Sequence, residues 1–293
     1  MSPWIDFICP DSESIKIEDC IAECRMSARC VSKPTLMLMS RRRMWKGKVS
    51  ATQALNGTRY EYLRMMHDYG EKPVDRAFAL LGTMHHLQHQ KIDIPGTLAE
   101  EWMSDDIGTG MFDYYDAEEK TLWEYKTAGA YKVNRCLGKI RIDEPVPGEF
   151  YKSGKRKGEQ KTKIVWSMGD PDTFDWRMQL SRYSWMLIDA GFPVEKIMVQ
   201  VTVRDFGAIV ARQYGLDRQI YLIPLELFPQ DYVVDYYRTK QDALIHALET
   251  NEMPPPCNEH ERWGGKRCER FCPIWEHCDV GIAAHRQMDE EEG

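Results

Sequence analysis

The sequence predicts an α/β protein that carries a cysteine-rich metal module at each end. Two patterns lead to this prediction: segments of helical and of strand periodicity are mixed through residues 41–253, and eight of the nine cysteines form two groups near the chain ends. In addition, 43% of the 293 residues are hydrophobic, which is enough to bury a core. We expect metal modules at 1–40 and 254–284, an α/β domain at 41–253 and an acidic tail at 285–293.

The two cysteine groups have the same spacing. Steps of 11, 4 and 6 residues separate the members of each group, which are Cys9, Cys20, Cys24 and Cys30, and Cys257, Cys268, Cys272 and Cys278. In a reducing compartment such a pattern indicates metal binding rather than disulfides. Four thiolates on a short loop can close around one ion or cluster, so we predict two local sites, with Cys136 left over as a small buried hydrophobic residue.

Zinc and iron–sulfur clusters both take four thiolates. The commonest zinc pattern leaves two residues between paired cysteines, whereas the shorter gaps here are three and five residues. Proline follows a cysteine at Cys9-Pro10 and at Cys272-Pro273, as it often does in iron–sulfur proteins. These features favour iron–sulfur over zinc, and we expect the modules to stabilise the fold rather than to carry electrons.

The elements of the central domain follow from periodicity and turn residues. Helices are predicted at 50–66, with Ser50 or Thr52 as cap, and at 73–90, 175–190 and 231–249; strands are predicted at 108–116, 121–127, 195–205 and 219–224. The second helix presents an apolar face made of Ala77, Leu80, Leu81, Met84 and Leu87. A basic, glycine-containing stretch before residues 163–166 predicts a loop or loose hairpin.

The hairpin formed by 108–116 and 121–127 carries the candidate chemistry. If its turn is centred between Glu118 and Glu119, positions whose numbers sum to 237 face each other, and Asp113 lies opposite Glu124. Side chains alternate along a strand, so Lys126 shares the face of Glu124. Two opposed carboxylates repel each other, and a divalent magnesium or manganese ion would relieve that repulsion. The same residues could instead form an exposed cross-strand cluster of charges.

Four short motifs resemble the RecB-like branch of the PD-(D/E)XK nuclease superfamily. They are Gly82-Thr83-Met84-His85-His86, Gly110-Met111-Phe112-Asp113, Glu124-Tyr125-Lys126 and Gln179-Leu180-Ser181-Arg182-Tyr183, which match G-x-x-x-H, G-x-x-D, (D/E)-x-K and Q-x-x-x-Y in that order. The match covers roughly residues 50–248. It implies a restriction-endonuclease-like core, with a central mixed sheet flanked by helices, for the domain at 41–253.

The resemblance also implies a role for each matching residue. Asp113 and Glu124 would ligate a catalytic Mg²⁺ or Mn²⁺, His86 would complete or adjoin that shell, and Lys126 would activate the attacking water. Glu100 or Glu101 precedes the hairpin, and we select Glu101 as a further metal ligand.

The last motif is expected on the DNA side of the site. Gln179 and Tyr183 would line that side, although their spacing of four residues also fits a buried helix face.

Relatives in this branch also indicate which metal centre the cysteines could hold and how they could share it. The CRISPR-adaptation nucleases and helicase-associated exonucleases that this chain is similar to carry a 4Fe-4S cluster, in which one upstream cysteine joins three near the C-terminus. One bridging cluster formed by Cys30 with Cys268, Cys272 and Cys278 is therefore an alternative to two local sites. We favour the two local sites.

Any contact with DNA must be local, because the formal net charge is −7. One basic run contains Arg41, Arg42, Arg43, Lys46 and Lys48; a second contains Lys152, Lys155, Arg156, Lys157, Lys161 and Lys163. Such runs are often solvated surface, but beside a nuclease site we expect Lys155, Arg156 and Lys157 to bind DNA.

We therefore expect a metal-dependent DNA nuclease, in the first place an exonuclease on single strands or duplex ends, that serves recombination, repair or replication of a bacterial or phage genome. The alternative is a non-catalytic DNA-binding or assembly module on a nuclease fold with structural zinc sites. No Walker-type phosphate loop is present, so unwinding would need a helicase or recombination partner. Without an apolar run of about 18 residues or a secretory leader, we expect a cytoplasmic protein and no membrane contact.

Overall fold

The computed structural model describes residues 4–26, 28–41, 45 and 47–292. In chain order the strands are β1 (Trp4–Ile8), β2 (Ser14–Lys16), β3 (Tyr69–Glu71), β4 (Thr97–Ser104), β5 (Thr109–Asp116), β6 (Thr121–Ala128), β7 (Lys139–Phe150), β8 (Gln160–Met168), β9 (Lys196–Val203) and β10 (Ile220–Leu225). The α-helices are α1 (Ile17–Ala22), α2 (Lys33–Met39), α3 (Ala51–Ala54), α4 (Thr58–Met66), α5 (Ala77–His89), α6 (Ala130–Cys136), α7 (Phe174–Asp189), α8 (Ala208–Tyr214), α9 (Gln230–Thr250), α10 (Lys266–Arg270) and α11 (Asp279–Glu292). Short 3₁₀ turns, η1 (Pro73–Arg76) and η2 (Trp275–His277), precede α5 and α11.

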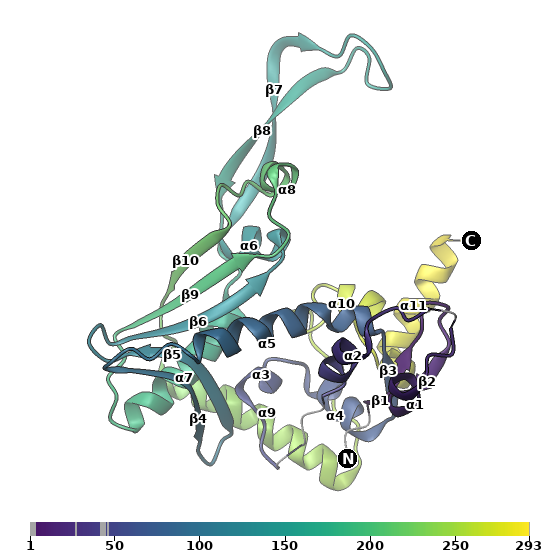
Figure 1. The fold of residues 1–293 in the computed structure, drawn as a ribbon. Helices are drawn as coiled ribbons and strands as arrows, with labels where there is room; N and C mark the ends of the chain where they lie inside the picture. Colours follow the sequence, from purple (N-terminus) through teal and green to yellow (C-terminus); the bar gives the residue numbers. More distant parts are fainter. Residues whose placement is uncertain (1–3, 27, 42–44, 46, 293) are drawn as a thin grey trace.

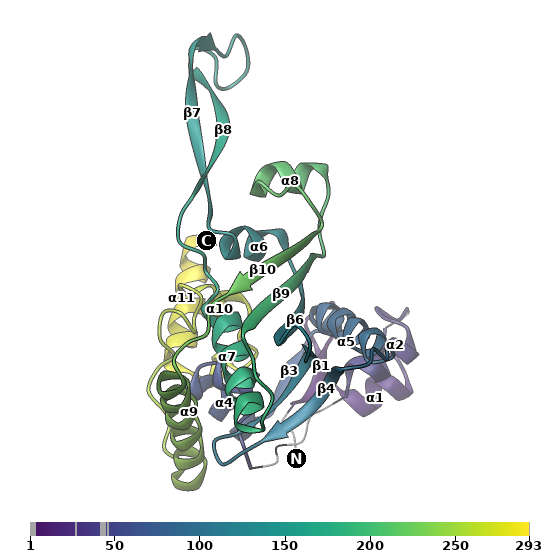
Figure 2. The same ribbon diagram turned by 90° about the vertical axis from the view of Figure 1, so that its left-hand side faces the viewer.

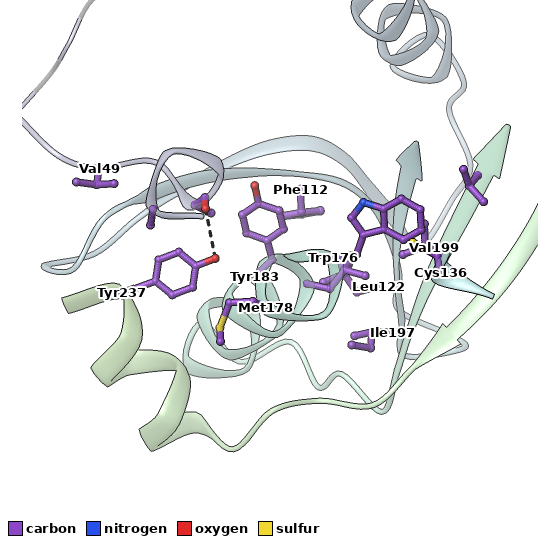
Figure 3. Close-up of a cluster of buried hydrophobic side chains, with 14 of the residues drawn as sticks. Val49, Phe112, Leu122, Cys136, Trp176, Met178, Tyr183, Ile197, Val199 and Tyr237 are labelled. Carbon is purple, nitrogen blue, oxygen red and sulfur yellow. Dashed lines mark hydrogen bonds between the residues drawn. The ribbon is translucent and has the colours of Figure 1, made fainter. Parts of the chain in front are cut away.

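A mixed five-stranded sheet forms the centre of the fold, which confirms the α/β prediction. Its strand order is β10-β9-β6-β5-β4, in which β6 and β9 run parallel and the other neighbours run antiparallel. Helices α7 and α9 lie on one side of this sheet and α5 lies on the other (Figures 1 and 2). Residues from the sheet and α7, among them Phe112, Leu122 and Tyr183, pack together in the core (Figure 3).

The predicted helix at 50–66 is two helices. Ser50 caps α3 through a capping box with Gln53, as the cap prediction required, but the helix ends at Ala54 and α4 begins only at Thr58. Gly57 lies in the break, and a Cβ there would come within 2.2 Å of the Cys257 sulfur. The break thus lets the C-terminal cysteine segment approach the backbone of α4.

The N-terminal segment does not stand apart from the central region. Strand β1 pairs with β2 and, in parallel, with β3 at residues 69–71. Trp4 and Phe7 of β1 are buried in the same core cluster as residues of α4. The boundary expected at residue 40 is therefore crossed by a shared sheet.

Helix α5 confirms the predicted helix at 73–90, but its apolar face is open to solvent. Leu81, Met84 and Leu87 are each about half exposed, and no residue of α5 is buried. Apolar spacing identified the helix correctly, since the period of 3.6 residues fixes the face. It does not reveal whether another element covers that face.

Strands β7 and β8 form a two-stranded arm that projects from the body (Figure 1). The arm was expected only as a loop or loose hairpin before residues 163–166. Pro145, Pro147 and Gly148 interrupt strand periodicity in β7, which conceals the strand in the sequence. The arm is inserted between α6 and α7 and so connects the two parts of the chain that carry Lys126 and Gln179.

Replacement of Gly110 by alanine should destabilise the fold. A Cβ at Gly110 would lie 2.3 Å from Cε1 of Tyr183, in a part of the core where both residues are buried. Overpacking of this kind costs about 1–3 kcal/mol, which urea denaturation measures directly. Gly207→Ala is the matched control, because nothing lies within 4 Å of a Cβ there. Equal stability of the two variants would contradict the close Gly110–Tyr183 contact.

Candidate active site

The site forms where β5 separates from β6. Their paired residues, Tyr114 with Trp123, Tyr115 with Leu122 and Asp116 with Thr121, all follow the predicted register. Pairing ends one step before Asp113 and Glu124. There the backbone N–H of Tyr125 donates instead to Oδ2 of Asp113 at 2.6 Å. The carboxylate of Asp113 is thereby fixed at the fork between the two strands.

Three potential metal ligands meet at this fork. Nδ1 of His86 lies 3.1 Å from Oε1 of Glu100 and 3.3 Å from Oδ1 of Asp113. Ligand atoms from these three residues all lie within 4.8 Å of one another, and both carboxylates are buried. The residues come from α5, β4 and β5 and are separated in sequence, so their convergence is a product of the fold.

Glu100, rather than the predicted Glu101, belongs to this group. Residues 99 and 101 of β4 pair with 114 and 112 of β5, which places Glu100 level with Asp113. The backbone of Glu100 adopts a left-handed conformation with φ of 54°, and its side chain is buried while Glu101 is exposed. The predicted ligand Glu101 lies outside this group by one residue, because neighbouring side chains on a strand point to opposite faces.

Lys126, Glu124 and Gln179 form a hydrogen-bonded triangle beside the three ligands. Nζ of Lys126 donates to Oε1 of Glu124 at 2.5 Å and to Oε1 of Gln179 at 3.0 Å. Nε2 of Gln179 donates to the same Glu124 oxygen at 2.9 Å. The other oxygen of Glu124, Oε2, is buried without a hydrogen-bond partner among the described residues. A buried carboxylate oxygen without a partner is costly unless a cation or donor satisfies it.

The pKa values reflect the crowding of acids. Burial, reinforced by the charge of Asp113, raises the pKa of Glu124 to about 7. The hydrogen bond to Asp113 raises the pKa of His86 to about 9 against the opposing effect of burial, with Glu100 adding to the rise. Burial also raises the pKa of Glu100. The raised pKa values mean that bound protons reduce the repulsion between the carboxylates, a role that a metal cation could take over.

The donor set fits a hard divalent cation. Carboxylate oxygens are preferred by Mg²⁺ and Mn²⁺, and an imidazole is accepted more readily by Mn²⁺ than by Mg²⁺. His86, Glu100 and Asp113 offer such donors, and Glu124 adds an unsatisfied oxygen nearby. His86, Glu100 and Asp113 could therefore hold one of these ions, with Glu124 as a further candidate ligand.

Gln179 and Tyr183, which the resemblance placed on the DNA side of the site, lie on a buried helix face, the alternative that their spacing allowed. Both are buried on α7, and the hydroxyl of Tyr183 lies 3.2 Å from Nε2 of Gln179. Tyr183 packs against Gly110, which accounts for the glycine of the Gly110 to Asp113 motif. Gln179 therefore positions Glu124 and Lys126, and Tyr183 supports Gln179 from the core.

The predicted basic residues lie away from the site. Lys155, Arg156 and Lys157 are exposed in the loop at the end of the β7–β8 arm (Figure 1). Arg156 is paired with Glu159 at 2.7 Å, whereas Lys155 and Lys157 form no ion pair with any residue that the structure describes. In the other basic run, Lys48 binds Ser104 and Asp105 near the start of β5, and Arg42, Arg43 and Lys46 lie outside the described residues.

The cysteines of the second group surround one cavity. Cys257, Cys268, Cys272 and Cys278 all line it, together with Arg59, Tyr60 and Leu63 of α4. Backbone N–H groups of Tyr60 and Ile274 donate to the sulfurs of Cys257 and Cys272, and Nη1 of Arg59 lies 3.8 Å from Cys278 Sγ. Such N–H donors favour thiolates, and the contacts from Tyr60 and Arg59 attach this segment to α4.

The first cysteine group also gathers locally. Cys20 is buried, which raises its pKa, and the thiols of Cys9, Cys24 and Cys30 lie near enough to raise it further. The alternative cluster would require Cys30 to join Cys268, Cys272 and Cys278, but Cys30 does not line their cavity. Cys136 is buried apart from both groups, and its sulfur lies 3.1 Å from the carbonyl oxygen of Asp172.

The adjacent glutamates on β4 provide a matched pair of variants. Glu100→Gln should weaken Mn²⁺ binding by at least about tenfold, because it removes a buried anionic ligand beside His86 and Asp113. Glu101→Gln changes an exposed side chain and should leave the affinity within about twofold. Calorimetric titration of both variants checks this. If only Glu101→Gln weakened Mn²⁺ binding, Glu101 rather than Glu100 would be the metal ligand.

Comparison with known proteins identifies no family. No family model matches the chain, and no curated protein does. One similar solved structure is that of SSO0001, at 16% sequence identity with a TM-score of 0.43, covering 85% of this chain and 94% of that one. Within the described residues, none of the helices has the length and apolar character needed to cross a membrane.

Proposed function

We propose that this chain is a metal-dependent nuclease of the PD-(D/E)XK type, which hydrolyses phosphodiester bonds in DNA on a restriction-endonuclease-like core. The observation that carries the proposal is the convergence of His86, Glu100 and Asp113 with the Glu124–Lys126 pair at the β5–β6 fork. Of these five residues, only Glu124 and Lys126 belong to the same motif. A solvated cluster of surface charges would not bury its carboxylates.

The carboxylates and His86 are proposed to hold a Mg²⁺ or Mn²⁺ ion. An ion of this kind neutralises developing negative charge on the phosphate and makes bound water more acidic. Asp113 is held by the Tyr125 N–H, and Glu124 is held by Gln179 and Lys126, so the ligands are positioned before substrate arrives. Glu124 retains a free oxygen for the ion.

Lys126 is proposed to orient the attacking water and to stabilise charge on the phosphate. Burial alone would lower the pKa of Lys126, but the Glu124 and Asp113 carboxylates outweigh it and raise the pKa, so the nitrogen is an ammonium at neutral pH. An ammonium donates hydrogen bonds and does not act as a base. Gln179 and Glu124 fix its position, which makes the donation directional.

The cysteine groups are proposed to hold two local metal centres, with 4Fe-4S clusters favoured over zinc. The support for iron–sulfur comes from the sequence, in which proline follows Cys9 and Cys272 and the shorter gaps between cysteines are three and five residues rather than two. Structural zinc is the competing candidate.

Digestion of labelled DNA tests the proposed activity. Single- and double-stranded DNA labelled at the 5′ or 3′ end is incubated with the protein and Mn²⁺ or Mg²⁺, with a chelator as control. We expect cleavage that requires the metal, and the order of products distinguishes digestion from an end from internal cleavage. Tight DNA binding without cleavage in either metal would favour a non-catalytic binding module instead.

The affinity for Mn²⁺ should rise with pH. The pKa of His86 is raised to about 9, and the pKa values of the Glu124 and Glu100 carboxyls are raised as well, so an ion must displace protons from these groups when it binds. The apparent affinity should increase by up to about tenfold per pH unit between pH 7 and 9. Calorimetry in buffers of different ionisation enthalpy measures the released proton. A pH-independent affinity would show that His86 does not bind the ion through the titrating nitrogen.

A further inference from the structure

His85 and His89 lie on α5 beside the candidate active site but take no part in it. They are four residues apart, one helical turn, so their side chains project from the same face of the helix. Their Nε2 atoms are directed at each other and lie 3.4 Å apart. His86, between them in sequence, turns instead toward Glu100 and Asp113.

One tyrosine holds both rings in this arrangement. His89 stacks on Tyr125 with ring centroids 4.0 Å apart and an interplanar angle of 17°. His85 meets the edge of the same ring at 5.9 Å and an angle of 67°. Both imidazoles are thus half-buried and oriented by packing, which lowers the entropy lost when a ligand binds them.

The two nitrogens form a long hydrogen bond at 3.4 Å, and the same separation also suits ligation of one metal ion. Two imidazole nitrogens bound to one tetrahedral ion at about 2.0–2.1 Å lie about 3.3–3.4 Å apart. The observed distance matches that edge of the tetrahedron.

We propose that His85 and His89 form a second metal site, which binds a divalent transition-metal ion of the zinc type through their Nε2 atoms. Neutral imidazole is a preferred ligand of such ions, whereas the carboxylate-rich group at His86 suits Mg²⁺ or Mn²⁺. Two protein ligands leave the remaining positions to water or to an anionic oxygen.

An ion at this site would hold the last turn of α5. No residue of α5 is buried, so apolar packing restrains this turn weakly. A bridge between His85 and His89 spans the turn that carries His86 and ties it to the ring of Tyr125 on β6. The second site would therefore position His86 without contacting the reacting atoms.

Calorimetric titration with Zn²⁺ tests the site, using the full chain with its cysteine modules loaded as purified. The variants are His85→Gln, His89→Gln, Asp113→Asn and, as control, His246→Gln, an exposed histidine on α9. We expect the parent, Asp113→Asn and His246→Gln to show the same Zn²⁺-binding event with similar affinity. In His85→Gln and in His89→Gln the affinity of this event should be at least tenfold weaker. This outcome does not depend on nuclease activity.

Thermal unfolding provides the second readout. Zn²⁺ should raise the melting temperature of the parent and of Asp113→Asn more than that of His89→Gln, while all of them should melt alike in chelator if they are equally folded. Unchanged Zn²⁺ affinity in His85→Gln and His89→Gln would overturn the site. So would loss of the binding event in Asp113→Asn alone, because the ion would then belong to the group at His86.

Discussion

Lys126→Met is expected to lower the rate constant of DNA cleavage by about 10²–10³-fold or more, since it removes a fixed donor of positive charge from the reaction site. Methionine keeps the unbranched apolar body of lysine and is only one atom shorter, so the packing around Gln179 should survive. DNA affinity should change little, because one buried ammonium contributes little to binding of a phosphate backbone that surface lysines contact. Single-turnover digestion of labelled DNA separates the two effects.

Lys72→Ala is the matched control for this variant. Lys72 is exposed between β3 and α5 and forms no ion pair in the described structure, so its removal should leave cleavage within about twofold of the parent. Cleavage that persists undiminished in Lys126→Met would show that the ammonium has no catalytic role. Equal losses in both variants would point to a general effect of charge.

Cys272→Ser is expected to lower the melting temperature by more than about 10 °C and to remove one metal centre, because bound metal at a four-thiolate site contributes directly to folding free energy. The cavity lined by Cys272 is built partly from α4, through Arg59 and Leu63. Arg59 also donates to the Pro254 carbonyl oxygen at 2.7 Å and pairs with Asp279. Loss of the metal should therefore loosen α4 as well as the C-terminal segment.

Cys136→Ser separates metal loss from a general effect of cysteine replacement. Cys136 is buried, but it belongs to neither cysteine group. Its replacement should leave the metal content unchanged and lower stability by only about 1–2 kcal/mol. Iron and sulfide analysis of anaerobically prepared protein, with its visible absorbance, distinguishes 4Fe-4S clusters from zinc. Unchanged metal content in Cys272→Ser would contradict the site at the second group.

The hairpin register was predictable because a short turn fixes it. Once Glu118 and Glu119 occupy the turn, every pair between β5 and β6 sums to 237, and the structure follows this rule up to Tyr114 and Trp123. The rule fails to describe the next step, where the strands part and the side chain of Asp113 takes the place of a backbone acceptor. The residues of the turn fix the register locally, whereas the point at which β5 and β6 separate depends on the elements that pack against both strands.

Glu100 illustrates what the sequence could not provide. Its selection over Glu101 depends on the pairing of β4 with β5 and on a left-handed backbone, neither of which has a signal in two consecutive glutamates. The burial of Gln179 and Tyr183 likewise depends on the position of α7 against the sheet. A useful sequence signal was Gly110, because a glycine inside a strand often marks a close approach, here of the Tyr183 ring.

The most direct test of the proposed site compares the parent with Asp113→Asn in Mn²⁺-dependent digestion of end-labelled DNA. Asp113 contacts His86 and lies at the fork, so its carboxylate connects the proposed metal ligands to the strand that bears Lys126. We predict metal-dependent cleavage by the parent and a loss of at least about 10³-fold in the variant. Cleavage of equal rate by the two proteins, or cleavage that persists in chelator, would contradict a metal-dependent nuclease site at Asp113.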